Sequence, residues 1–427
     1  MVLKIKLISY IFVSVLFFSN YTLSSQILDY ETELFINKLI LDVKSVNKFN
    51  KNIKVHIIKD DNPNAFVIPN NKLIVSSGLL EQSPDYVSLL AVLAHEVGHL
   101  EYFHLEKRKD SLEKFSKLNI ISDLALITGS ILSQNPEVLG ATIASKANIN
   151  NFYFSFSREQ EREADLYSIK TLQKLNLPSE SIKKLLKILE KNALDRGFDE
   201  NYQKFSTHPI FRERYEIIDY NSKNKIFYFN KDTQDEFNFI KAKFMAYNDN
   251  FNVAKLNDDH RIYYDSINNS KSGNLIISLK NLNFLIKKFP KNIFLLETKG
   301  DILRSHGYLN ESVKFYKIVL NKYPNNHYIK YKIFLDTNTQ NMQSNNKINF
   351  FYENLNLIIQ FPKNKYILNK FLKIAKDLEK IYWVNFFNII INANYKDMGM
   401  FKKKLNNVSK ETNEIKLKKI INEYNKL

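Results

Sequence analysis

Two histidines and a glutamate lie close together in the stretch AVLAHEVGHLEYFH, which begins at Ala91. His95 and His99 are four residues apart, so on a helix they share one face and offer two imidazole nitrogens to one metal ion. Glu96 follows the first histidine and projects beside the ion, where its carboxylate can take a proton from water. The neighbouring side chains are uncharged, as a helix packed into a core requires. The pattern predicts a Zn²⁺ site with hydrolytic chemistry, and an ordinary buried helix is the alternative.

A catalytic zinc site needs a third protein ligand and one open position for water. The segment SREQEREAD (157–165) supplies the best candidates, because Glu161 and Asp165 are four residues apart on one helix face. One carboxylate would bind the metal, while Asp165 would accept the second N–H of a ligand histidine. Glu159 and Glu163 in the same segment are predicted to be solvated charges. Glu161 is therefore the predicted third ligand.

The other histidines near and far from this motif are not expected to bind the metal. His104 lies nine residues after His95, half a turn out of register for a fourth ligand, and is predicted to be structural. Four more histidines have no metal-binding residues arranged around them and are taken as non-functional: His56, His260, His306 and His327.

The elements that must position these residues follow from the hydrophobic pattern. Four helices are expected, at 27–50, from Asp85 to about Lys109, at 157–175 with Ser157 as N-cap, and near 179–194. Short strands are expected at 54–59 and 72–77. The apolar segment 119–145 is predicted to be a hydrophobic hairpin or flap that covers the cleft, touches the membrane surface or simply packs in the core.

The second half of the chain is predicted to be helical and contains a repeat. Pro290 in FPKN and Pro324 in YPNN are 34 residues apart, and Gly300 lies where the small residue of a first helix belongs. A helix–turn–helix period of 34 residues that closes on proline is the tetratricopeptide plan. FPKN recurs at 361–364, which indicates a more degenerate unit, and the tail from Lys365 is expected to be helical outside the repeat. The alternative is an α-helical domain in accidental register.

The first 25 residues predict export. Lys4 and Lys6 precede an uncharged, mostly apolar stretch at 7–18, which is the plan of a secretory signal peptide and is short for a membrane span. No A-x-A precedes residue 26, so an uncleaved N-terminal anchor remains the alternative. Both interpretations place the body of the protein outside the cytoplasm, with the periplasm as the expected compartment.

Composition excludes several classes of protein. With 427 residues, 44% hydrophobic and 25% charged, the chain is expected to form two folded units of a soluble globular protein. The absence of cysteine excludes disulfides, a thiolate zinc site and a cysteine nucleophile. The net charge of +17 comes mostly from lysines spread over the whole chain, without an arginine cluster or nucleic-acid motif. No nucleic-acid partner is therefore expected.

Four ordered motifs together resemble the HtpX/BepA/CAAX-endopeptidase family of zinc metallopeptidases. H-E-x-x-H is followed by S-R-x-x-E-x-x-A-D and then by T-H-P with an arginine, and NAFVIPNNKLIVSSGLL (64–80) is similar to the strand segment of the family. The matching positions are His95, Glu96, His99, Ser157, Arg158, Glu161, Ala164, Asp165, Thr207, His208, Pro209 and Arg214. Asn70 and Asn71 stand where the family commonly has glycines, and asparagine also tolerates positive φ. The resemblance covers roughly residues 26–220.

The resemblance implies Zn²⁺ on His95, His99 and Glu161, with Glu96 as general base and acid. It implies that strand 72–77, at a sheet edge, holds the substrate as an added strand.

His208 keeps three interpretations. It is a movable fourth ligand that silences the enzyme until a partner arrives, or it joins Arg214 in stabilising the oxyanion, or it is a surface histidine in a loop.

The expected fold is α+β, a gluzincin-type metallopeptidase domain with a small sheet, followed by an all-α tetratricopeptide-like repeat domain. The expected boundaries are a signal peptide at 1–25, the peptidase domain at 26–225 and the repeat domain at 226–427. Exported relatives with such repeats are the BepA-like periplasmic peptidases, so the expected substrates are misassembled envelope proteins. The repeat domain would bind extended polypeptide or outer-membrane assembly machinery.

Two rival functions remain. One is a repeat-based chaperone or adaptor of outer-membrane assembly whose metal site is idle or self-inhibited, although an intact Glu96 argues against a purely structural site. The other is a membrane-anchored housekeeping protease that uses residues 7–18 as its tether.

Overall fold

The computed structural model describes residues 26–107, 156–195, 212–221, 228–250, 252–393 and 398–426. The expected signal peptide at 1–25, the apolar segment at 119–145 and His208 lie outside these residues. The chain divides into two compact units. The first contains residues 26–27 and the described residues from Leu39 to Phe229, and the second contains 28–38 and the described residues from Asn230 onward.

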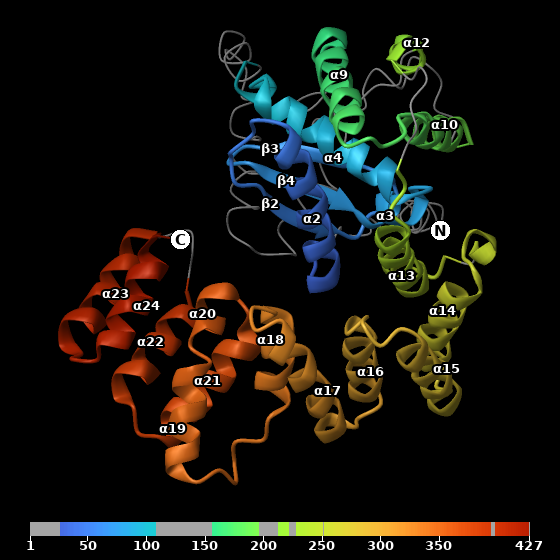
Figure 1. Ribbon diagram of the computed structural model, residues 1–427. Helices are drawn as coiled ribbons and strands as arrows, with labels where there is room; N and C mark the ends of the chain where they lie inside the picture. The colour runs from blue at the N-terminus through green and yellow to red at the C-terminus, as the bar shows by residue number, and fades with distance from the viewer. Residues whose placement is uncertain are drawn as a thin grey trace, which may run out of the picture. The chain divides into compact units, whose positions relative to one another are not determined.

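The first unit combines a small sheet with helices, as the expected α+β class requires (Figure 1). Its elements are β1 (Gln26–Ile27), the second part of α2 (Tyr30–Val46), β2 (Lys54–Ile58), β3 (Ala65–Ile68), β4 (Lys72–Ser76), α3 (Ser77–Gln82), α4 (Tyr86–Glu101), α9 (Arg158–Lys174), α10 (Glu180–Asp195) and α12 (Arg212–Asn221). The expected strands at 54–59 and 72–77 are confirmed as β2 and β4, and the expected helix at 157–175 as α9.

The sheet has the order β1-β2-β4-β3, with β2 parallel to β4 and the other two pairs antiparallel. The prediction that strand 72–77 lies at a sheet edge is therefore wrong. Among the described residues the edge beside β4 is β3, a four-residue strand that the sequence pattern did not reveal. All five residues of β4 are buried, as expected for a strand with a neighbour on each side and both faces covered. Asn70 and Asn71 join β3 to β4 with φ of 67° and 54°, which confirms their expected tolerance of positive φ.

Helix α4 is shorter than the sequence predicts. Asp85 caps its first turn by accepting a hydrogen bond from the Ser88 amide at 2.7 Å. The helix was expected to reach Lys109, but it ends at Glu101, because Phe103 adopts a left-handed φ of 57°. Lys51 holds this break from outside: its Nζ donates to the Leu100 carbonyl at 3.0 Å and lies 3.9 Å from the centre of the Phe103 ring.

Helices α4 and α9 approach each other closely. A Cβ at Gly98 would lie 3.2 Å from Ala164 Cα and 3.1 Å from Tyr167 Cβ, so the two backbones meet where both helices carry small residues. The Ser168 hydroxyl then donates to the Ala91 carbonyl at 2.7 Å and fixes the register. Ser157 caps α9 with a complete capping box, which confirms it as the N-cap.

The second unit is helical in its described residues. Besides Leu28–Lys38, which includes the start of α2, it contains α13 (Lys231–Tyr247), η1 (Val253–Lys255), α14 (Asp258–Lys271), α15 (Leu275–Lys288), α16 (Phe294–Ser305), α17 (Leu309–Lys322), α18 (His327–Asp336), α19 (Ser344–Glu353), α20 (Asn356–Gln360), α21 (Lys365–Asp377), α22 (Ile381–Ile391), α23 (Met398–Glu411) and α24 (Ile415–Lys426). In the part of the chain described, no helix is long and apolar enough to cross a membrane.

The backbone repeats its geometry with the predicted period. Gly273 and Gly307, 34 residues apart, have φ of 83° and 84° and each precedes a second helix of identical length. The residues that end those helices, Phe289 and Tyr323, share a φ near −120°, and Phe361 ends α20 at −129°. The same turn chemistry therefore closes α15, α17 and α20.

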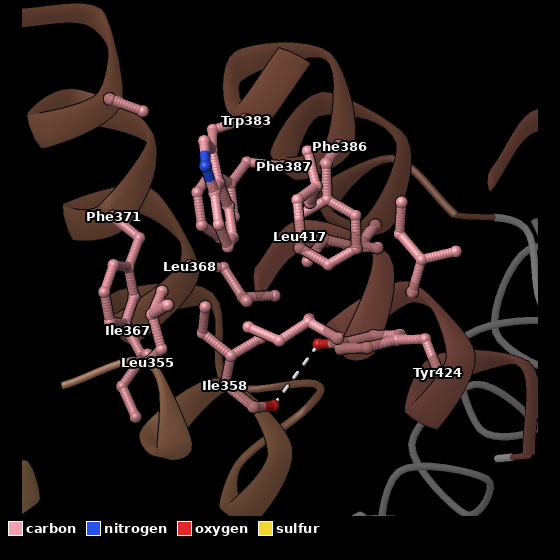
Figure 2. Packing of buried hydrophobic residues seen from close by; sticks show 14 of the residues in the cluster. Leu355, Ile358, Ile367, Leu368, Phe371, Trp383, Phe386, Phe387, Leu417 and Tyr424 are labelled. Carbon is pink, nitrogen blue, oxygen red and sulfur yellow. Dashed lines mark hydrogen bonds between the residues drawn. The ribbon is translucent and has the colours of Figure 1, made fainter. Parts of the chain in front are cut away.

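Aromatic packing fills the end of the second unit (Figure 2). Trp383 is fully buried and stacks on Phe387, with ring centroids 5.8 Å apart. Its indole N–H donates to Glu414 at 2.6 Å. The Tyr424 hydroxyl of α24 donates to the Pro362 carbonyl at 2.7 Å and lies 3.5 Å from the Ile358 carbonyl, the contact drawn in Figure 2. Since Trp383 is the only tryptophan of the chain, its fluorescence reports on this unit alone.

Leu28–Lys38 packs inside the second unit although it lies far away in the sequence. Phe35 is fully buried and stacks on Phe237 of α13, with centroids 5.8 Å apart. The Lys243 ammonium, also from α13, lies 2.6 Å from carboxylate oxygens of both Asp29 and Glu31. A buried ammonium needs such partners, because an unpaired charge in a core is costly.

Gly300 should be intolerant of a side chain, because a Cβ there would lie 2.5 Å from the ring of buried Tyr316 in α17. We expect Gly300→Ala to lower the free energy of unfolding by about 1–3 kcal/mol, although alanine alone favours helix by about 1 kcal/mol. Urea unfolding followed by Trp383 fluorescence measures the effect. The same substitution should cost less in a Tyr316→Leu background, and an equal cost in both backgrounds would contradict the proposed clash.

Glu33 should make the second unit less stable at alkaline pH. Burial raises its pKa to about 7, even though the Tyr328 hydroxyl hydrogen-bonds to it. Between pH 4.5 and 7 the folded state then holds a proton that the unfolded state releases, so stability falls as the pH rises through this window. By pH 8 this loss should amount to up to about 2–3 kcal/mol of the free energy of unfolding. Glu33→Gln, which does not titrate, should not show the loss. Unfolding of Glu33→Gln and of the control Glu236→Gln at pH 5 and 8 checks this, and an unchanged pH slope in Glu33→Gln would refute it.

Candidate metal centre

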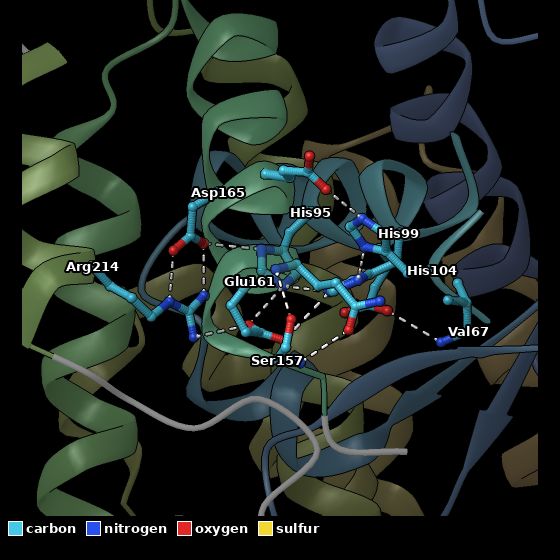
Figure 3. A network of polar contacts seen from close by, with 11 residues as sticks. Val67, His95, His99, His104, Ser157, Glu161, Asp165 and Arg214 are labelled. Carbon is cyan, nitrogen blue, oxygen red and sulfur yellow. Dashed lines mark hydrogen bonds and ion pairs between the residues drawn. The ribbon is translucent and has the colours of Figure 1, made fainter. Parts of the chain in front are cut away.

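Three buried side chains from α4 and α9 converge on one point (Figure 3). The Nε2 atoms of His95 and His99 are 3.0 Å apart. A Glu161 carboxylate oxygen lies 3.4 Å from the first of these nitrogens, and its other oxygen lies 3.5 Å from the second. All three residues are no more than 6% exposed. The structure thus brings together the three side chains that the sequence nominated as ligands.

These distances suit a tetrahedral metal ion. Zinc bonds of about 2.0–2.2 Å to nitrogen and oxygen, at tetrahedral angles, place donor atoms about 3.3–3.6 Å apart. The observed separations of 3.0, 3.4 and 3.5 Å need only small adjustments to reach that geometry. Two imidazoles and one carboxylate also form a donor set that Zn²⁺ favours. The residues present therefore fit a zinc ion.

His95 is oriented from behind by a buried ion pair. Its Nδ1 lies 2.9 Å from Asp165, which is held in turn by two Arg214 nitrogens at 2.7 Å each. Burial alone would raise the pKa of Asp165, but the Arg214 guanidinium and the His95 hydrogen bond outweigh it and keep this pKa low. Asp165 therefore stays ionised and accepts the Nδ1–H of His95, leaving Nε2 bare toward the metal position.

The site as a whole favours positive charge between the imidazoles. Burial opposes protonation of His95, yet hydrogen bonds and charges of Asp165 and Glu161 raise its pKa. Arg214 also lies 3.7 Å from Glu161, so one guanidinium serves both carboxylates. In a centre that already contains two acidic groups, a divalent cation held by His95, His99 and Glu161 would take the place that a proton otherwise fills.

His99 is oriented by residues whose role the sequence did not reveal. Its Nδ1 lies 2.9 Å from Nδ1 of His104, and Nε2 of His104 lies 2.8 Å from the Glu163 carboxylate. Phe156 stacks on the His99 ring with centroids 3.8 Å apart. The only sequence signal for this group is the five-residue spacing from His99 to His104. On a straight helix this spacing would point the two side chains in different directions.

Glu96 lies beside the edge strand. It is 1% exposed, and its carboxylate accepts the Val67 amide of β3 at 3.1 Å. This amide lies on the side of β3 that β4 does not occupy in the sheet, so the edge of the sheet and the carboxylate meet at the same place.

The remaining residues singled out in the sequence differ in where the structure places them. Arg214 is buried and forms ion pairs with Asp165 and Glu161. Its suggested partner His208 lies outside the described residues, so their joint role stays a prediction. Glu159 is 72% exposed, as expected for a solvated charge, whereas Glu163 combines 41% exposure with its bond to His104.

Comparison with known proteins places this site in a family. The model of peptidase family M48 matches residues 32–222. The mitochondrial metalloendopeptidase OMA1 of Schizosaccharomyces pombe is 25% identical over 190 residues, which cover 44% of this chain and 52% of that protein. The beta-barrel assembly-enhancing protease of Escherichia coli K12 is 24% identical over 181 residues, 42% of this chain and 37% of the relative.

A putative beta-barrel assembly-enhancing protease of Vibrio cholerae is 30% identical over 135 residues, 31% of this chain and 27% of its own length. The chain thus spans about half or less of the relatives it matches. The matched region contains both ligand helices and the edge strand, and every predicted metal ligand lies within it. Residues 32–222 form a domain of peptidase family M48.

Proposed function

We propose that the protein is an exported zinc-dependent endopeptidase that removes misassembled envelope proteins. The observation that carries the peptidase assignment is the convergence of His95, His99 and Glu161, with ligand atoms 3.0–3.5 Å apart, in a domain of a metallopeptidase family. Glu96 next to these ligands supplies the acid–base group that a structural zinc site does not need.

Each residue has a distinct part in the proposed reaction. A zinc ion held by the three ligands would polarise the scissile carbonyl and lower the pKa of water to about 7. Glu96 takes the proton from the attacking water and delivers it to the leaving amine. Its hydrogen bond from Val67 orients the carboxylate for both transfers. The Asp165–Arg214 pair keeps His95 in the tautomer that leaves Nε2 available.

The substrate is proposed to bind as an extended strand beside β3. Backbone hydrogen bonds to a sheet edge select for unfolded or extended polypeptide and depend little on side-chain identity. This preference suits a protease that acts on proteins that have failed to fold. It also moves the proposed substrate strand from β4 to β3, which is the edge strand among the described residues.

The proposed envelope role rests on the relatives and on the repeat in the second unit. Three relatives are named for beta-barrel assembly or are mitochondrial metalloendopeptidases. The 34-residue recurrence of backbone geometry in the second unit supports a tetratricopeptide-like repeat that binds polypeptide or assembly machinery. The proposal of export to the periplasm rests on the signal-peptide pattern of residues 1–25. Digestion of an unfolded outer-membrane β-barrel protein, compared with its folded form in detergent, tests the substrate class.

Glu161→Gln should weaken metal binding while the fold survives. The amide removes the charged ligand, and its neutral oxygen is a poorer donor for a cation. We expect zinc content to fall from one per chain to a small fraction after dialysis, measured by atomic emission. Glu159→Gln, two residues away and solvent-exposed, is the matched control and should keep its zinc. Full zinc retention by Glu161→Gln would remove this residue from the ligand set.

Glu96→Gln separates an enzyme from an adaptor with an idle metal site. The substitution keeps an acceptor for the Val67 amide but removes the base, so casein cleavage should fall by a factor of about 10²–10⁴. Zinc content should remain near one per chain. Cleavage equal to that of the unsubstituted protein, or equal rescue of a deletion strain, would favour the chaperone or adaptor function instead.

A further inference from the structure

We propose that His104 and Glu163 are positioning residues that hold His99 in its metal-binding tautomer and so set the zinc affinity. This inference rests on the proposed zinc site and assigns a role to two side chains that are not ligands. It concerns the group on the far side of His99 from the metal position, which Figure 3 shows as a chain of hydrogen bonds.

The hydrogen-bond distances fix the direction of this chain. A metal on Nε2 of His99 requires the proton of that ring to be on Nδ1. That N–H points at Nδ1 of His104 at 2.9 Å, so this second nitrogen must carry a lone pair and accept. The proton of His104 is then on Nε2, where it donates to the Glu163 carboxylate at 2.8 Å. With a neutral His104, every donor in the series meets an acceptor only when His99 Nε2 is left bare.

The local fold is built to make this contact. On a continuous helix, His104 would lie about 140° around the axis from His99 and could not reach its ring. The left-handed Phe103 ends α4 and turns the chain back, so His104 becomes fully buried beside His99. A positive φ at a bulky aromatic residue costs on the order of 1–2 kcal/mol. Lys51 stabilises this conformation through the Leu100 carbonyl and the Phe103 ring.

The two ligand histidines are therefore supported in different ways. Behind His95 stands a carboxylate neutralised by a buried guanidinium. Behind His99 stands a neutral imidazole, and the charge that polarises it is one residue further away on a side chain that is 41% exposed. Partners of this kind commonly change metal affinity by about 10–100-fold when they are removed.

The test is the zinc dissociation constant of full-length variants, measured by competition with a fluorescent chelator. His104→Phe fills the same space without an acceptor and should weaken zinc binding about 10–100-fold. His104→Asn places an oxygen close to the position of Nδ1 and should restore most of the affinity. Glu163→Ala should have a smaller effect, about 3–10-fold, because water can reach the exposed end of the chain. Glu159→Ala on the same helix is the control and should bind zinc normally.

A role in stability alone would give a different result. The thermal unfolding temperature of the metal-free proteins, measured in EDTA, reports packing without the metal. If His104→Phe lowers that temperature and leaves the zinc dissociation constant within twofold of the unsubstituted value, the positioning role is refuted. A tautomer measurement gives an independent check: selective ¹⁵N labelling of histidine should show His104 protonated on Nε2 in the zinc-loaded protein, and protonation on Nδ1 would overturn the proposal.

Failure of this inference can be told apart from failure of the proposed function. If the unsubstituted protein binds no zinc, the peptidase proposal fails as well. If it binds one zinc ion and cleaves casein while all four variants bind equally well, only the role of His104 and Glu163 is refuted.

Discussion

The structure depends on one constraint, which is that the Nε2 atoms of His95 and His99 lie 3.0 Å apart in a buried site. Each lone pair repels the other, and burial removes the water that would otherwise solvate them. When both nitrogens carry lone pairs, the arrangement needs a positive charge between them. Asp165 behind one ring and His104 behind the other occupy the Nδ1 protons, so neither ring can relieve the repulsion by changing tautomer. The two imidazoles and the Glu161 carboxylate therefore form a site that favours a cation.

The helices and strands of the first unit hold these side chains in position. Gly98 and Ala164 let α4 and α9 approach closely enough for a glutamate of one helix to face histidines of the other. The short α9 side chain Ser168 fixes the register through the Ala91 carbonyl. On the other side of α4, the edge strand β3 contributes a backbone amide to Glu96. The proposed ligands, the proposed base and the proposed substrate-binding edge are thus fixed by contacts between regular elements rather than by loops.

The sequence predicted which side chains converge at this site, because those side chains obey helical periodicity. His95 with His99, and Glu161 with Asp165, are each four residues apart on helices whose caps are legible in the sequence. The predictions failed where the backbone leaves a regular path. β3 is only four residues long and follows a turn-forming segment, so its period could not be recognised and the edge was assigned to β4. His104 is structural, as predicted, but its contact with His99 could not be predicted, because the left-handed residue that redirects it is a phenylalanine, which gives no sign of a break in the helix.

The inclusion of Leu28–Lys38 in the second unit has a consequence for how the chain folds. These residues leave the ribosome about two hundred residues before α13, whose Phe237 and Lys243 receive Phe35 and the paired carboxylates. Until then an apolar, acidic helical segment has no partner, and contacts of such long sequence separation form slowly. The second unit therefore cannot complete its fold before α13 has been synthesised. During synthesis, the segment Leu28–Lys38 can reach its native position only after residues from the middle of the chain have been made.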